Sequence, residues 1–158
     1  QIQYEGPDEI AAVIVEAVIG ANGVLIPPEG YMQGLRELTR KYNILLICDE
    51  VMAGFYRTGK LFSFMNWNIE PDMITFAKGI TCGYVQLGGV IISKEISDFY
   101  KDKVFQYGLT YSGHSLACAV GVATLESYEK LNIEDNVRKS GKFFKDFLEK
   151  MEKKQNVL

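Results

Sequence analysis

The chain has 158 residues, enough for one ordinary domain with a hydrophobic core. An apolar fraction of 47% and a charged fraction of 23% exclude a disordered chain. A formal net charge of -3 leaves no broad basic surface for nucleic acid, and the apolar runs are too short to span a membrane, so we expect neither partner.

Segments typical of strands alternate with segments typical of helices along the chain. Apolar runs predict strands at residues 10–16, 44–48, 73–77 and 88–93. Helical spacing of apolar residues predicts helices at residues 29–42, 94–101, 116–131 and 133–154. We expect Pro28 and Glu29 in the first turn of the first helix, and Ser93 or Ser97 as the cap of the second. This alternation predicts an α/β fold with a mostly parallel sheet and flanking helices.

Two carboxylates directly follow the second predicted strand. The run at 45–48 is apolar enough for a fully buried strand, and Asp49 and Glu50 come next. Buried carboxylates need a partner, and Lys78 ends the following strand. Because ligands bind beyond the carboxyl ends of such strands, we expect Asp49 and Lys78 to face one crevice. Glu16 ends the first strand and is expected at the same rim, either against a substrate amine or an arginine, or simply in solvent.

The same region also fits parts of a nucleotide-binding pattern. Residues 46–50 resemble a Walker B strand, and residues 54–60 fit the P-loop pattern G-x-x-x-x-G-K. However, Leu61 stands where the P-loop needs a serine or threonine for Mg²⁺. The loop also trails the acidic strand instead of leaving a strand of its own, so the pattern argues against an ATPase.

The chemistry of Lys78 and Asp49 suits a carbonyl cofactor. A lysine that ends an apolar strand is partly desolvated, which frees its amine to act as a nucleophile toward a carbonyl such as that of pyridoxal phosphate. The pyridine nitrogen of that cofactor needs a carboxylate, which Asp49 can supply. The alternatives are a lysine that extends to solvent and an aspartate in an ordinary turn.

A hydroxyl-rich stretch before the third helix could hold a phosphate. Residues 108–115 offer Thr110, Ser112 and Ser115 near a helix start, where anions bind well; the alternative is an ordinary helix cap. His114 is the single histidine and lacks a plausible catalytic partner in sequence, so we expect a structural role for it.

Cysteine usage adds little. Cys48, Cys82 and Cys118 form no C-x-x-C pair, which indicates neither a disulfide framework nor a zinc site, so we expect no metal and a cytoplasmic location. The sequence begins at Gln1 in mid-pattern and without a secretory signal, from which we expect a processed chain or a fragment.

Taken together, these motifs resemble the class III pyridoxal-phosphate-dependent aminotransferases of fold type I. The resemblance rests on ordered blocks at residues 11–16, 20–30, 46–51, 54–59, 71–79 and 108–114. It implies that residues 1–130 are the later part of the large cofactor-binding domain. Residues 131–158 would be a helix leading into a C-terminal domain that the chain lacks, which would cover the helix's phenylalanine-rich face.

The resemblance also implies roles for single residues. Lys78 would form the Schiff base with pyridoxal phosphate and then act as the acid–base, and Asp49 would bind the pyridinium nitrogen. Val51 would pack on the ring. Thr110 would reach the cofactor phosphate of the other subunit in a homodimer, with Ser112 as a second candidate.

The same resemblance bears on the substrate. Glu16 would lie near the substrate end of the site, whereas Arg57 would be mainly structural. The sequence of residues 18–28 and 76–79 is most similar to those of ω-amino acid or amine:pyruvate aminotransferases, taurine:pyruvate enzymes included. Ornithine, 4-aminobutyrate and diaminopelargonate aminotransferases remain alternatives, so the amino donor and the 2-oxo acid acceptor are left open. A fragment that folds without catalysing a reaction is the alternative.

Overall fold

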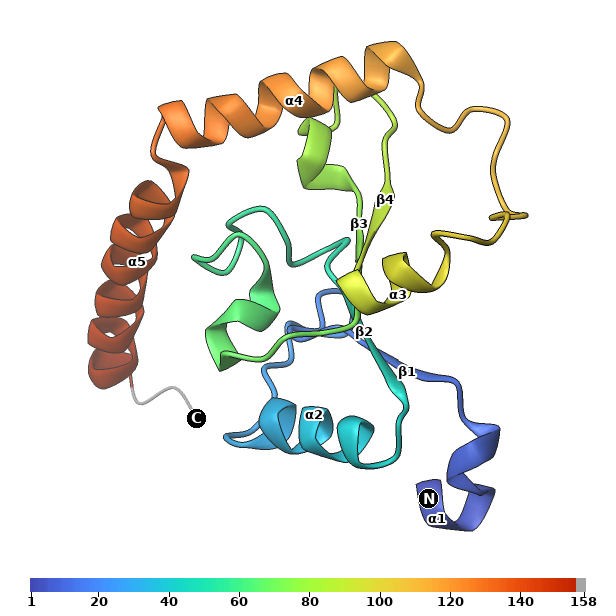
Figure 1. Cartoon of the computed structure of the whole chain (residues 1–158). Helices are drawn as coiled ribbons and strands as arrows, with labels where there is room; N and C mark the ends of the chain where they lie inside the picture. Colours follow the sequence, from blue (N-terminus) through green and yellow to red (C-terminus); the bar gives the residue numbers. More distant parts are fainter. Residues whose placement is uncertain (156–158) are drawn as a thin grey trace.

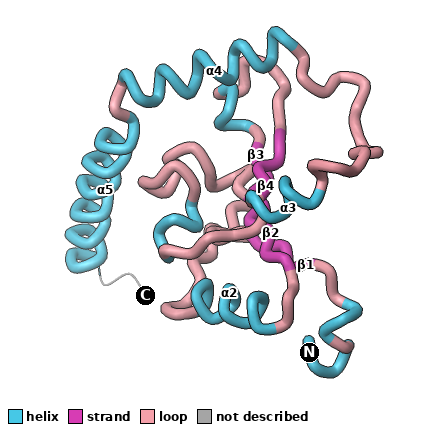
Figure 2. Tube along the Cα trace, in the orientation of Figure 1, coloured by secondary structure: helices cyan, strands magenta, loops and turns pink. Residues whose placement is uncertain are grey.

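A four-stranded sheet lies at the centre of the computed structural model, which describes residues 1–155 (Figure 1, Figure 2). In sheet order its strands are β1 (Ala12–Val15), β2 (Leu45–Asp49), β3 (Met73–Phe76) and β4 (Gly89–Ile92). The first three strands run parallel, and β4 pairs antiparallel with β3. The predicted α/β fold with a mostly parallel sheet is therefore confirmed.

The helices agree with the predicted ranges to within a few residues. They are α2 (Tyr31–Lys41), α3 (Lys94–Phe99), α4 (Ser115–Lys130) and α5 (Ile133–Gln155). Short turns of helix were not predicted: α1 (Ile2–Glu5), η1 (Pro7–Glu9), η2 (Ser63–Trp67) and η3 (Lys78–Thr81). None of the helices within residues 1–155 is both long and apolar enough to cross a membrane.

Two helix starts decide between the expected caps. Gly30 precedes α2 with a left-handed φ of 77°, so Pro28 and Glu29 lie before the helix and their predicted place in its first turn is wrong. Glycine reaches that conformation without a Cβ penalty, and the chain turns there. Ser93, not Ser97, caps α3, since its hydroxyl accepts the Ile96 N–H at 3.3 Å.

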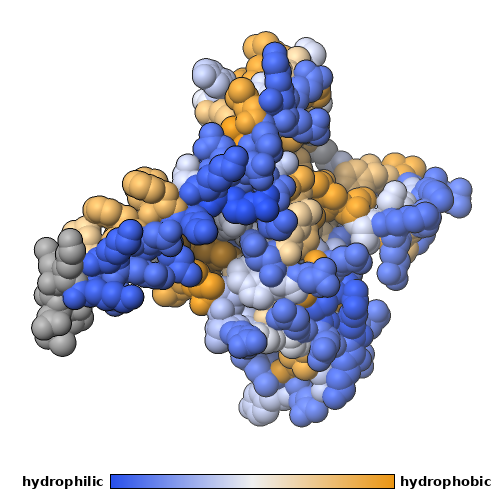
Figure 3. All heavy atoms as spheres, turned by 90° about the vertical axis from the view of Figure 1, so that its left-hand side faces the viewer, coloured by the Kyte–Doolittle hydropathy of each residue, from blue (hydrophilic) through white to orange (hydrophobic). Residues whose placement is uncertain are grey.

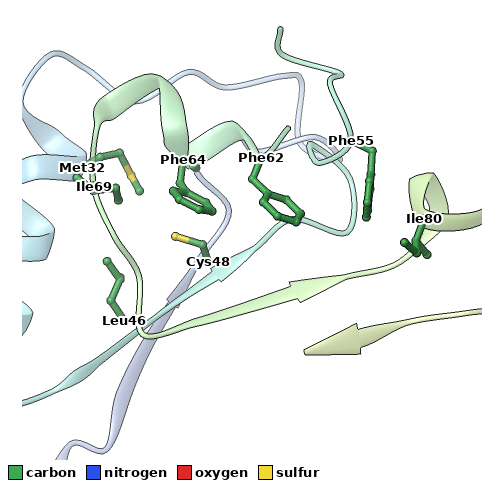
Figure 4. Close-up of a cluster of buried hydrophobic side chains, with 9 residues drawn as sticks. Met32, Leu46, Cys48, Phe55, Phe62, Phe64, Ile69 and Ile80 are labelled. Atoms are coloured by element: carbon green, nitrogen blue, oxygen red, sulfur yellow. The ribbon is translucent and has the colours of Figure 1, made fainter. Parts of the chain in front are cut away.

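The core lies on one face of the sheet. Leu46 and Cys48 of β2 are fully buried and pack with Met32 of α2 and with the aromatic loop after β2 (Figure 4). The opposite face stays largely uncovered, with Ile14 62% exposed and Leu45 37% exposed. The prediction of a fully buried second strand is therefore wrong, because the described helices leave much of this face open.

A partly buried ion pair ties α2 to the sheet. Arg36 donates two hydrogen bonds to the Asp72 carboxylate, at 2.6 and 2.7 Å, and Asp72 also accepts the Leu46 N–H at 2.7 Å. Burial opposes ionisation of Asp72, but the bonds from Arg36 and Leu46 outweigh it and hold the pKa of the carboxyl below its ordinary value. This clamp fixes the start of β3 beside β2.

Candidate active site

Strand register places three polar side chains in a row on the open face of the sheet. Asp49 pairs with Thr75 across β2 and β3. Val15 pairs with Cys48 across β1 and β2. The next residues along the two chains, Glu16 and Asp49, are therefore in register. Side chains in register on neighbouring strands share a face. The expectation that Glu16 and Asp49 meet at one rim therefore agrees with the sheet topology.

The adjacent carboxylates of Asp49 and Glu50 point to different sides. Glu50 is fully buried, and its carboxylate accepts the Ser63 N–H at 2.8 Å, the Ser63 hydroxyl at 2.6 Å and the Phe64 N–H at 3.0 Å. Asp49 is half-buried on the open face, where its Oδ1 accepts the Val51 N–H at 3.0 Å. Glu50 thus stabilises the loop, as expected for a structural residue, and Asp49 stays available for chemistry.

Lys78 follows β3 in a strained backbone conformation. Its φ is 46°, in the left-handed region, which costs a non-glycine residue about 1–3 kcal/mol. Strain of this kind gathers at functional sites. The side chain is exposed, so the predicted partial desolvation does not hold within residues 1–155. Its Nζ lies 2.7 Å from the sulfur of Met52.

A continuous set of contacts joins Lys78 to Glu16. The Met52 side chain touches Lys78 on one side and Gly20 on the other, where a Cβ added to Gly20 would come within 2.8 Å of Met52 Cε. The N–H of Gly20 in turn donates to Glu16 Oε2 at 3.0 Å. Glu16 therefore holds a local turn, and no ion pair with an arginine forms within residues 1–155.

The hydroxyl-rich loop lies apart from this row. Thr110 and Ser112 are both exposed, and Ser112 Oγ accepts the Leu109 N–H at 3.2 Å. Ser112 lines a hollow of about 450 Å³, whereas Lys78 lines another of about 490 Å³. The segment at 85–88 borders both hollows, and Asp49 lines neither. The structure therefore does not bring the loop to Lys78 within this chain.

Two further expectations are settled by local contacts. His114 caps α4, with Nδ1 accepting the Ala117 N–H at 3.4 Å, which confirms its structural role. The P-loop-like segment opens no α-helix; its Lys60 forms an ion pair with Glu134 at 3.1 Å. The arrangement that a P-loop needs is therefore absent from residues 54–67.

Comparison with known proteins decides the family. The profile of the family described as Aminotransferase class-III matches residues 1–158, the whole chain. The chain is a class III aminotransferase sequence. It is 41% identical over 152 residues to gamma aminobutyrate transaminase 3 of Solanum lycopersicum, covering 93% of this chain and 29% of that protein. It is also 41% identical over 150 residues to the diaminobutyrate–2-oxoglutarate transaminase of Halomonas elongata, covering 92% and 32%.

Solved structures of class III aminotransferases share the fold. The taurine:2-oxoglutarate aminotransferase of Bifidobacterium kashiwanohense, in complex with pyridoxal phosphate and glutamate, is 58% identical with a TM-score of 0.94, over 98% of this chain and 34% of that one. An (S)-enantioselective omega-transaminase from Thermomicrobium roseum is 47% identical with a TM-score of 0.89, over 96% and 34%. The chain thus spans about a third of the length of the class III aminotransferases it matches.

The site residues of this aminotransferase segment fit pyridoxal phosphate. An exposed lysine amine stands after β3, and a carboxylate ends the neighbouring strand β2 on the open face. Beside that carboxylate, the hydroxyl of Thr75 is buried without a hydrogen-bond partner. Polar groups left unpaired in this way need an explanation, and a site for a polar ligand provides one. The predicted roles of Val51, Thr110 and Ser112 stay predictions.

Sequence reasoning missed a clamp at the far end of the sheet and the contacts of Met52 at the site. Arg36 and Asp72 form the clamp, and Met52 links Lys78 to Gly20. Asp72 could have been found from its place just before a buried strand, where a carboxylate needs a cation. Met52 gave no such signal, since an apolar residue after a strand is ordinary.

Proposed function

We propose that the full-length protein uses pyridoxal phosphate to transfer an amino group from a small amine donor to a 2-oxo acid, with this chain supplying Lys78 and Asp49. One observation carries the proposal: Asp49 ends β2 and Lys78 follows the adjacent parallel strand β3, in a chain that the class III family covers from end to end. Ligands of parallel sheets bind at that edge.

Lys78 and Asp49 would have different roles in this reaction. Pyridoxal phosphate, when bound, supplies a carbonyl that captures amines and a ring that accepts electrons. Lys78 Nζ would hold the cofactor through its amine, and as a free amine it would move protons at the reacting carbon. The Asp49 carboxylate holds the proton on the ring nitrogen, because an anion there favours the cationic form.

Similarity supports a donor with a terminal acid group. The 58% identity to a taurine:2-oxoglutarate aminotransferase favours taurine or a related ω-amino acid as donor. It also favours 2-oxoglutarate as the acceptor beside pyruvate. Relatives that act on gamma-aminobutyrate are 41% identical and make 4-aminobutyrate the second candidate donor. Rates with taurine, β-alanine and 4-aminobutyrate, each paired with pyruvate and 2-oxoglutarate, separate these candidates.

Cofactor attachment gives the direct test. We expect a visible absorption band when pyridoxal phosphate is added to the full-length apoprotein, and borohydride reduction should fix the label on the peptide that contains Lys78. Lys78→Ala should lose both signals, whereas Lys60→Ala, which removes an exposed lysine outside the site, should keep them. A label on another lysine would contradict the proposal. The 158-residue chain tested alone shows whether it is a fragment that binds no cofactor.

We also propose a homodimer in which Thr110 acts across the interface. The exposed loop that carries Thr110 lies apart from Lys78 within one chain, which is consistent with a site shared between subunits. Mixing inactive Lys78→Ala and Thr110→Ala subunits would leave one complete site of the two in each mixed dimer, so each mixed dimer should have about half of the activity of the wild-type dimer. No recovery on subunit exchange would rule this arrangement out.

A further inference from the structure

The turn that presents Lys78 is held from a distant helix. Tyr128, in α4, donates its hydroxyl proton to the carbonyl oxygen of Gly79 at 2.7 Å, across 49 positions of sequence. Gly79 directly follows Lys78 in η3. We propose that Tyr128 is a positioning residue for Lys78, which fixes the strained turn through this hydrogen bond so that the amine is presented at the open face. This inference rests on the proposed function of Lys78.

The turn is confined on its other side as well. A Cβ added to Gly79 would lie 2.7 Å from both Cβ and Cδ2 of Phe55, so the Phe55 ring leaves room for glycine alone. Phe55 is itself buried, and its ring centroid lies 6.3 Å from that of Tyr128. The Gly79 peptide is therefore held between an aromatic wall and a hydroxyl donor.

The donor of each hydrogen bond around Tyr128 follows from chemistry. The Gly79 carbonyl can only accept, so the single phenolic proton is used in the 2.7 Å bond. The Cys82 sulfur lies 3.1 Å from the Tyr128 oxygen and must then be the donor of that contact. Burial raises the pKa of Tyr128 above its ordinary value, so the hydroxyl stays protonated.

The Tyr128 contact matters because the Lys78 conformation is sparsely populated. Lys78 has a φ of 46° and Cys82, at the other end of η3, has a φ of 50°. Such conformations persist only when the surrounding structure determines them. Within η3 the Cys82 N–H also donates to Gly79 O, but at 3.3 Å. The shorter bond from Tyr128, together with the contact of Phe55 on Gly79, keeps the turn from relaxing and displacing the Lys78 amine.

Tyr128→Phe in the full-length protein removes the hydroxyl and keeps the ring. We expect hydrogen exchange in the apoprotein, in the peptide spanning residues 78–84, to become about threefold to tenfold faster, as for loss of one neutral hydrogen bond. With cofactor, kcat should fall by about the same factor while KM changes by less than about twofold, because Tyr128 acts through Lys78 and does not touch substrate.

Tyr56→Phe is the matched control. The Tyr56 ring packs edge-on against Tyr128 at 5.8 Å, so this variant removes a neighbouring phenol but leaves the Gly79 bond in place. Its exchange and kcat should equal those of the wild type. Cys82→Ala should shift both readouts in the same direction as Tyr128→Phe but less, and Cys82→Ser, which keeps a donor, should restore them.

The outcomes separate this inference from the proposed function. Unchanged exchange and unchanged kcat in Tyr128→Phe would overturn the positioning role, as would equal effects in Tyr56→Phe or faster exchange throughout α4. Absence of the visible band from the wild-type protein would overturn the proposed function itself, and the positioning role with it.

Discussion

Asp49 and Glu50 are adjacent in the sequence but have different roles, one at the candidate site and one in the core. The side chains of Asp49 and Glu50 leave the end of β2 on opposite sides of the sheet, because successive side chains of a strand alternate. Glu50 enters the core and meets three donors from residues 63 and 64. Asp49 faces the open side beside Thr75. The two residues should therefore respond differently to the same loss of charge.

We expect Glu50→Gln to destabilise the protein. The amide replaces an acceptor oxygen with an NH₂ group that faces the donors of Ser63 and Phe64, so at least one buried donor loses its partner. Such losses cost about 2–3 kcal/mol in the free energy of unfolding. Urea unfolding of the apoprotein measures it. Glu70→Gln, at an exposed site, should leave this free energy unchanged.

Asp49→Asn should give the opposite pattern. Its carboxylate makes one hydrogen bond at the edge of the core, so we expect unfolding of the apoprotein to change by less than about 1 kcal/mol. Affinity for pyridoxal phosphate should fall about tenfold to a hundredfold, because a charged hydrogen bond to the ring nitrogen is lost. Titration followed by the visible band measures this affinity, and wild-type affinity would show that Asp49 does not face the cofactor.

At the scale of elements, the clamp between Arg36 and Asp72 makes packing depend on pH. The pKa of Asp72 is lower in the folded protein than its ordinary value of 3.8. Its contribution to stability is therefore complete above that ordinary value and is lost as pH falls through the folded pKa. Asp72→Asn should cost about 2–4 kcal/mol at neutral pH. The unfolding free energies of variant and wild type should then converge as pH falls through the folded pKa of Asp72, below 3.8.

An exposed ion pair provides the control for this pH dependence. Asp98 accepts from Lys94 and from Lys101, the latter at 2.7 Å, but all three side chains reach solvent. Solvent screens such pairs. The unfolding free energy of Asp98→Asn should equal that of the wild type at every pH. A difference from the wild type that disappears only at low pH should therefore be seen for Asp72→Asn alone. Parallel curves for Asp72→Asn and the wild type would contradict the role of the clamp.

The elements that could be predicted are those set by nearby sequence. Apolar runs identified β2 and β3, and their order along the chain correctly predicted that the two strands are neighbours. That Asp49 and Lys78 face one crevice stays a prediction. The clamp was missed because Arg36 and Asp72 are 36 residues apart, and no local pattern joins them. The exposure of Lys78 was also missed, since it depends on which layers cover the sheet. The left-handed φ of Lys78 arises from tertiary contacts that local propensity does not encode.

At the scale of the whole molecule, α5 is the element least explained by the rest of the chain. It extends away from the sheet beyond α4 (Figure 1). Figure 3 shows its apolar residues gathered along one side of the projecting arm. Phe143 is 68% exposed, Phe144 61% and Leu148 61%. An exposed stripe of this kind marks an interaction surface. That a C-terminal domain covers it stays a prediction.

Charged substitutions in this stripe should benefit the 158-residue chain, by reducing its self-association, but should destabilise the full-length protein. In the 158-residue chain, Phe144→Asp and Phe147→Asp together should reduce self-association, because charge removes the apolar surface that drives it. In the full-length protein the same pair should lower stability, since a covering domain would bury both charges at a cost of several kcal/mol. Light scattering measures the first effect and urea unfolding the second. Lys142→Asp and Lys145→Asp, on the polar side of the helix, should change neither self-association nor stability. If the two phenylalanine substitutions left the stability of the full-length protein unchanged, nothing would pack on the stripe.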